Sequence, residues 1–180
     1  MRTLWPLLAG ALVLGACDIT NPPNWTADYL FPLNFPAVDL SGIPGGVIPI
    51  DSVSFTTPVI TQDAEEGLVG RILQSEDLAA LRAEVILRTT LDVTGAVELS
   101  IATSQAGLFD PAQSLTTTIS VSQGTNTSFV DANLAVFKGA TTLYFQSNVT
   151  VAGPNGSIAV PPGSEIGIGV NFIGTVRVSK

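Results

Sequence analysis

RAEVILRTTLDVT, residues 82–94, alternates between apolar and polar side chains along its whole length. Its even positions are charged or polar apart from Ile86. Its odd positions, which would share the other face of a strand, hold Ala83, Val85, Leu87, Thr89, Leu91 and Val93. Because successive side chains of a strand point to opposite faces, the pattern predicts a strand with one buried and one wet face. Such strands are typical of an antiparallel sheet.

The same style of alternation recurs on both sides of this stretch. Further strands are expected at residues 47–60, 96–101, 115–121, 142–151, 157–160 and 165–179. Pro154-Asn155-Gly156 predicts a hairpin turn, and residues 161–164 (PPGS) predict another turn. Many short strands with few helices indicate an all-β fold. We therefore expect an antiparallel β-sandwich, either Ig-like or jelly-roll, with a β-barrel as the alternative.

Helix signals are scarce. One short helix is expected near residues 71–81, where Ser75 can cap a start before Leu78 to Leu81. Residues 131–137 (DANLAVF) could form a single turn.

The last strand carries Gly167 and Gly169 on the face opposite its apolar side chains. Glycine in a strand marks a bend or a close approach of another backbone. Two interpretations follow: the strand bends where it crosses between sheets, or the glycines floor a shallow groove in which a ligand lies on bare backbone.

The start of the chain has the features of an export signal. A short start with Arg2 precedes an apolar run, residues 4–14, and then the small residues Gly15 and Ala16. The run is shorter than the ~20 residues that a membrane-spanning helix needs. The sequence Leu14-Gly15-Ala16-Cys17 resembles the lipobox of bacterial lipoproteins. This resemblance implies cleavage between Ala16 and Cys17, and acylation of the Cys17 thiol and of the new amino group.

Three regions follow from these signals: a signal peptide at 1–16, an acylated proline-rich tether at 17–45, and a β-sandwich domain at 46–180. Five prolines favour extended backbone in the tether, which could reach about 90 Å at ~3.3 Å per residue. Its aromatic residues are unusual for a linker. Either part of the tether packs on the domain as an edge segment, or Trp25 and Tyr29 lie at the membrane interface.

Charge narrows the possible partners. The formal net charge is -8, which becomes -9 once Arg2 is removed, and no Lys or Arg lies between Arg2 and Arg71. Such a segment is repelled by phosphates, so no nucleic-acid partner is expected, and anionic headgroups would not attract it. Acyl chains would then hold the protein on a membrane of the bacterial cell envelope, facing the periplasm or the cell surface.

The sequence contains few of the residue types that catalytic sites use. The chain has no histidine, so it lacks a Ser-His-Asp triad and imidazole ligands for zinc, and its single cysteine can form no internal disulfide. No catalytic, cofactor-binding or metal-binding residue is therefore expected, and the protein is not expected to be an enzyme. Adjacent acids (Glu65 with Glu66, Glu76 with Asp77) and loop oxygens at 63–66 and 131–133 fit solvated surface better than a hydrolase or calcium site.

Three functions remain. The first is a lipid-anchored, non-catalytic binding or structural module for a protein or glycan partner. The second is a carrier of an apolar ligand in an inter-sheet cavity lined by such residues as Leu87, Leu91, Phe145 and Phe172. The third is a hydrolase that uses carboxylates alone.

Overall fold

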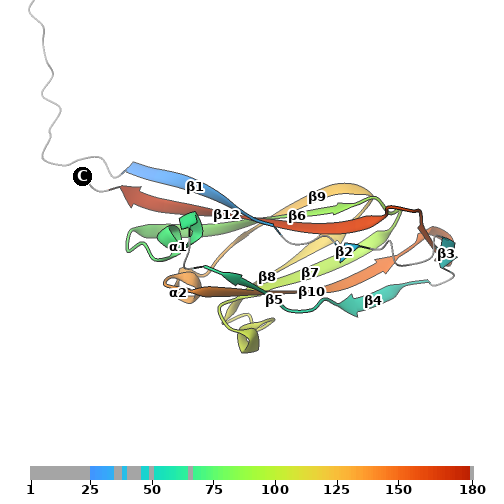
Figure 1. The fold of residues 1–180 in the computed structure, drawn as a ribbon, viewed down its shortest axis with the longest axis horizontal. Helices are drawn as coiled ribbons and strands as arrows, with labels where there is room; N and C mark the ends of the chain where they lie inside the picture. The colour runs from blue at the N-terminus through green and yellow to red at the C-terminus, as the bar shows by residue number, and fades with distance from the viewer. Residues whose placement is uncertain (1–24, 35–37, 40–45, 49–50, 65–66, 179–180) are drawn as a thin grey trace, which may run out of the picture.

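Two antiparallel sheets face each other across the core of the structure, a computed structural model that describes residues 25–34, 38–39, 46–48, 51–64 and 67–178 (Figure 1). The first sheet has the order β1 (Trp25–Asn34), β12 (Glu165–Val178), β6 (Leu78–Thr89) and β9 (Gly124–Asp131), with β2 (Val38–Asp39) pairing with the start of β12. The second sheet has the order β4 (Val53–Thr56), β10 (Thr142–Ala152), β7 (Thr94–Ala102) and β8 (Ser114–Val121), with β5 (Ile60–Asp63) also pairing with β10.

Smaller elements close the two ends of the sandwich. A two-stranded sheet of β3 (Gly46–Ile48) and β11 (Ile158–Val160) lies at one end, and the helices α1 (Gly67–Leu73) and α2 (Leu134–Phe137) lie at the other (Figure 1). Of the helices in the described part of the chain, none is long and apolar enough to cross a membrane.

The strand pairs are nested along the chain. β1 pairs with β12, β4 with β10, β6 with β9, and β7 with β8. The chain is thus a long antiparallel hairpin that has rolled up, with β12 pairing with β6 and β10 with β7 to complete the two sheets. This is the connectivity of a jelly roll. The expected antiparallel sandwich is confirmed in its jelly-roll form, and the barrel alternative is wrong because the two sheets are separate.

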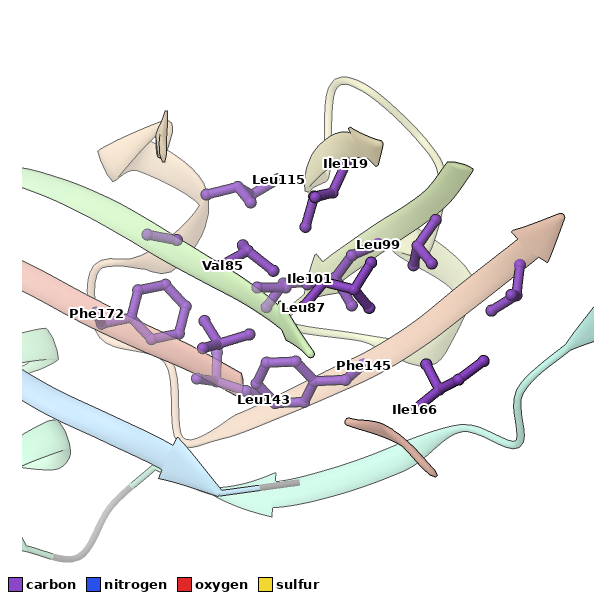
Figure 2. Packing of buried hydrophobic residues seen from close by; sticks show 14 of the residues in the cluster. Val85, Leu87, Leu99, Ile101, Leu115, Ile119, Leu143, Phe145, Ile166 and Phe172 are labelled. Carbon is purple, nitrogen blue, oxygen red and sulfur yellow. The ribbon is translucent and has the colours of Figure 1, made fainter. Parts of the chain in front are cut away.

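The face predicted to be buried in residues 82–94 lies in the core. Val85 and Leu87 are 0% exposed, and the other odd positions are buried with them. Figure 2 shows these two side chains of β6 gathered with Leu99 and Ile101 of β7, and all four belong to one apolar cluster. The first sheet therefore has one buried face and one solvent-exposed face, as the alternation of apolar and polar residues predicts.

The expected helix at 71–81 is wrong over most of its length. α1 ends at Leu73, and Leu78 to Leu81 open strand β6. Ser75 caps a turn instead, since its Oγ accepts a hydrogen bond from the Asp77 amide at 3.2 Å. Pairing with β12 and burial in the core override the local helix signal. The single turn expected at 131–137 is present as α2.

The Pro154-Asn155-Gly156 turn forms, but it does not make a hairpin. Asn155 and Gly156 have φ of 58° and 70°, the positive values that this dipeptide favours. The strand after it, β11, pairs with β3 and not with the preceding β10. The predicted hairpin between β10 and β11 is therefore wrong. The dipeptide determines the conformation of the turn, but it does not determine which strand β11 pairs with.

The sandwich begins inside the stretch that the sequence assigns to the tether. β1 pairs with β12 along its full length, from Trp25 opposite Val178 to Asn34 opposite Gly169. The expected start at residue 46 is therefore too late, and the interpretation of this stretch as an edge segment is the better one. Pro32 is tolerated because an edge strand needs backbone donors on one side only.

The last strand does not cross between sheets. β12 stays in the first sheet throughout and pairs with β6 from Ile166 to Val176. Its register shift lies between Thr175 and Val176, away from Gly167 and Gly169. The interpretation of these glycines as a bend between sheets is therefore wrong.

Candidate functional site

The outer face of the first sheet exposes an aromatic ring. Phe129 of β9 is 49% exposed and is the one exposed large hydrophobic side chain within residues 51–64 and 70–177, the ranges in which side-chain exposure is described. β9 alternates in exposure, so Thr125, Thr127 and Phe129 point outward while Val130 packs against the core. Because β9 is the outermost strand of this sheet, the ring stands at the margin of a broad, solvent-facing surface.

Arg82 of the neighbouring strand β6 contacts the Phe129 ring. Its guanidinium carbon lies 4.6 Å from the ring centroid, within the range of a cation–π contact. Its Nε also lies 3.7 Å from the Asp131 carboxylate, directly opposite it in the register. Both charged side chains remain half or more exposed (52% and 91%), so this ion pair orders the side chains more than it stabilises the fold.

A second polar pair lies beside the ring. Glu84 of β6 is opposite Phe129 on one side and opposite Asn171 of β12 on the other. The Asn171 amide donates a hydrogen bond to the Glu84 carboxylate at 2.8 Å. One row across three strands thus presents an amide, a carboxylate and an aromatic ring on the same face.

The next row of paired residues across the same three strands carries no charged side chain. Ile86 lies between Gly169 of β12 and Thr127 of β9. A Cβ placed on Gly169 would lie 3.9 Å from the Ile86 carbonyl oxygen and 4.0 Å from the Ile86 Cβ, so β6 leaves room for a side chain at this glycine. Gly167 and Gly169 are both half-buried, and their interpretation as the floor of a groove stays a prediction. We call the surface the Phe129 face and define it by Arg82, Glu84, Ile86, Thr127, Phe129, Asp131, Gly169 and Asn171.

The Phe129 face combines the groups that recognise a flat amphipathic ligand. The aromatic ring offers an apolar surface for stacking. Arg82 offers several N–H donors in a planar fork, and Glu84 and Asp131 offer carboxylate acceptors. These groups are spaced by the regular register of adjacent strands, so a ligand would meet a largely preformed surface.

The outer face of the second sheet is different in kind. The Thr56 hydroxyl donates to Asn148 Oδ1 at 2.8 Å, and Asn148 Nδ2 donates to the Glu98 carboxylate at 3.0 Å. These polar groups are thus paired with one another across β4, β10 and β7. None of the large hydrophobic side chains exposed in the described ranges lies on this face. We therefore place the candidate site on the first sheet.

Four residues singled out from the sequence lie outside the described residues: the lipidation residue Cys17, the cleavage residue Ala16, and the adjacent acids Glu65 and Glu66. Their roles remain predictions. Trp25 and Tyr29 lie in β1, whose backbone pairing is described.

The candidate carboxylates in the described part of the chain do not converge. Glu76 and Asp77 are exposed in the turn before β6, where their backbone carbonyls accept from Lys138 Nζ at 2.8 Å and from the Arg177 amide at 2.9 Å. Among possible calcium ligands, Asp131 contacts Arg82, and Asn133 Oδ1 caps α2 by accepting from the Ala135 amide. Within the described residues, no group of three or more acids or cysteines is arranged to hold a metal ion.

The residues proposed to line a ligand cavity are core residues. Leu87, Leu91, Phe145 and Phe172 are all buried and belong to the same apolar cluster. Phe172 also packs against Phe137 of α2, with ring centroids 6.3 Å apart. Their packing gives the carrier hypothesis no specific support.

Sequence patterns alone miss the Phe129 face. β9 reads GTNTSFVD, and its inward positions include Asn126 and Ser128, so it lacks the apolar alternation of the other strands. One signal was available: Phe129 and Val130 are adjacent apolar residues in a polar stretch, and both cannot point inward from one strand.

Comparison with known proteins gives no functional assignment. No family model matches the chain, and no curated protein matches it. Similar solved structures include one of Desmodium yellow mottle tymovirus, with 13% identity, 100% of this chain and 97% of that chain covered, and a TM-score of 0.30. Another is of turnip yellow mosaic virus (8% identity, 99% and 89% covered, TM-score 0.33), and a third is of rhinovirus-B5 (13%, 99% and 96%, TM-score 0.28). Since the TM-scores are this low, these likenesses carry no argument, and the fold rests on the strand pairing described above.

Proposed function

We propose that this protein is a lipid-anchored lipoprotein of the bacterial cell envelope whose sandwich is a non-catalytic binding module for a glycan or protein partner. The lipobox-like sequence Leu14-Gly15-Ala16-Cys17 supports the anchor. The acidic composition supports attachment through acyl chains, since a net charge of -8 does not favour adsorption to anionic lipid. The domain then faces the periplasm or the cell surface.

The observation that carries the binding role is the exposed Phe129 ring under the Arg82 guanidinium. Removing a ring of this size from water is favourable, yet the fold leaves it about half exposed on an ordered polar surface. A ligand that stacks on the ring would recover that free energy.

Of the two partners, a glycan fits this surface better than a protein. A pyranose ring has an apolar C–H face and a rim of hydroxyls, which matches one aromatic ring bordered by guanidinium, carboxylate and amide groups. A stable protein interface usually buries about 800 Å² on each partner around a core depleted of charge. The Phe129 face instead has charged residues on both sides of a single ring.

Binding to polysaccharides tests this proposal. We would incubate residues 17–180, carrying Cys17→Ser, with insoluble β-linked glucan, with chitin and with peptidoglycan sacculi, and measure depletion from solution. We expect depletion by at least one of them and its loss in Phe129→Ala, with Thr118→Ala on the second sheet as the matched control. No depletion by any probe, or equal depletion of both variants, would contradict the glycan assignment.

The anchor is tested separately. Protein recovered from bacterial membranes should carry acyl groups on Cys17 by mass spectrometry and should require detergent for release. Cys17→Ser should appear in the soluble fraction. An unmodified Cys17 in the membrane-derived protein would refute the lipoprotein assignment.

A further inference from the structure

Residue 25 already lies in the sheet, and this limits the distance between the sandwich and its anchor. Trp25 is opposite Val178 in the β1–β12 register. We propose that acylated Cys17 holds the sandwich with its α1/α2 end next to the lipid surface and its β3/β11 end pointing away. This inference rests on the proposed anchor, and it adds the part of the molecule that meets the membrane.

The chain available as a tether is short. Only residues 18–24 separate Cys17 from Trp25. Eight Cα–Cα steps span at most about 26–29 Å even when fully extended. A sandwich that began at residue 46 could instead lie about 90 Å from the lipid and face any direction.

The sandwich is longer than this tether. β12 has 14 residues and runs the length of the first sheet, which gives about 46 Å at ~3.3 Å per residue. Its last residues lie beside the start of β1, and the strand begins at the other end of the sandwich, where β3 lies (Figure 1). The sandwich, at about 46 Å, is thus longer than the ~26–29 Å that the tether can span. In an upright molecule the α1/α2 end can therefore lie at the lipid surface, whereas the β3/β11 end cannot.

The anchor-side end is defined by its contacts. α1 packs against β1 and β12. The loop after α2 joins this end, because the Gly139 amide donates to the Leu73 carbonyl at 2.8 Å. Both helices thus lie at the same end of the sandwich, and α2 presents the exposed side chain of Ala135.

Charge opposes a molecule that lies flat. The mature chain carries a net charge of -9 (the formal -8 with Arg2 removed), so its body is repelled by anionic headgroups. The second sheet presents Glu98, whereas Glu84 and Asp131 on the first sheet stand beside Arg82 and Arg88, so the repulsion comes from the net charge of the whole molecule and not from the first sheet alone. The tether keeps the α1/α2 end close to the membrane while the rest of the sandwich is repelled. The strands therefore point away from the membrane surface. The Phe129 face then stands on the side of the upright sandwich.

Energy transfer from the protein to the lipid surface tests this orientation. In the acylated protein the Cys17 sulfur is blocked, so an introduced cysteine is the only free thiol. Ala135 and Ala159 are a matched pair, because both are exposed alanines, one in α2 and one in β11. Acylated Ala135→Cys and Ala159→Cys would carry a donor dye in vesicles of phosphatidylethanolamine and phosphatidylglycerol that contain an acceptor-labelled lipid. We expect several-fold more transfer from position 135 than from position 159.

A longer tether provides the control. Twenty Gly/Ser residues inserted between Asn24 and Trp25 should bring the two transfer efficiencies close to each other, since a long flexible linker no longer fixes one end at the surface. Equal transfer without the insertion, or more transfer from position 159, in protein whose acylation is verified by mass spectrometry, would overturn the orientation and leave the anchor intact. Absence of acyl groups on Cys17 would overturn both proposals.

Discussion

The guanidinium of Arg82 on β6 lies over the ring of Phe129 on β9, with 4.6 Å between the guanidinium carbon and the ring centroid. The two residues are not directly opposite, since Arg82 faces Asp131 and Phe129 faces Glu84. Their contact is therefore diagonal across two antiparallel strands, within reach of long and aromatic side chains. It exists because the β6–β9 register places both residues on the outer face.

A double-mutant cycle measures this contact. Arg82→Ala and Phe129→Ala should show a coupling free energy of about 0.5–1 kcal/mol, the usual size of an exposed cation–π pair. The free energies of unfolding would come from urea denaturation of the two single variants and the double variant. Strictly additive effects would mean that the guanidinium and the ring do not interact in solution.

The two faces of β6 should respond differently to the loss of a side chain. Leu87→Ala removes a side chain that is 0% exposed and should lower the free energy of unfolding by about 2–5 kcal/mol. Ile86→Ala, the next residue, removes a partly exposed side chain from the outer face and should have a clearly smaller effect. Urea midpoints compare the pair directly, and equal losses would be incompatible with the alternation.

Two glycines make a similar matched pair. Gly95 has φ of +153°, and a Cβ there would overlap the carbonyl oxygen of Thr150 on β10. Gly95→Ala should therefore lower the free energy of unfolding by about 1–3 kcal/mol or more. Gly169→Ala, where the nearest atom of β6 is 3.9 Å away, should have little effect on thermal unfolding. A Gly95→Ala variant that unfolds at the parent temperature would show that β7 and β10 are not packed this closely.

A hydrogen bond to Ser100 connects the loop between β7 and β8 to the second sheet. Its side chain is 0% exposed, and its Oγ accepts from the Phe109 amide at 2.8 Å. Ser100→Ala removes that acceptor, so we expect a loss of about 1–3 kcal/mol. Hydrogen exchange should show faster exchange of the Phe109 amide. Thr118→Ala, on an exposed position of β8, is the control that should leave this exchange unchanged.

Local alternation predicts most of the strands because each buries a single face. Residues 82–89 show this best, since every second side chain is buried against the opposite sheet. The same test does not detect β9, where Asn126 and Ser128 occupy inward positions. Edge strands such as β1 are also hard to predict, because prolines that break a central strand are acceptable at an edge.

The candidate site could not be predicted from sequence for a different reason. It depends on which strands become neighbours and in what register. Glu84 meets Asn171 and Phe129 only because β12 and β9 flank β6, and they come from distant parts of the chain. Local patterns specify that each residue points outward, whereas the nested pairing of the jelly roll brings them together.

The first strand of the sheet is best tested by truncation. We expect residues 25–180 to unfold in urea at the same midpoint as residues 17–180 with Cys17→Ser, because both keep β1. Residues 46–180 lose the ten-residue β1 and leave the matching edge of β12 without a partner. An unpaired edge of this length promotes association, so this chain should aggregate or elute as oligomers in size-exclusion chromatography. Neither truncated chain contains Cys17, so acylation cannot explain a difference between them. Monomeric residues 46–180 with an unchanged urea midpoint would show that β1 is dispensable and that the folded domain starts after it.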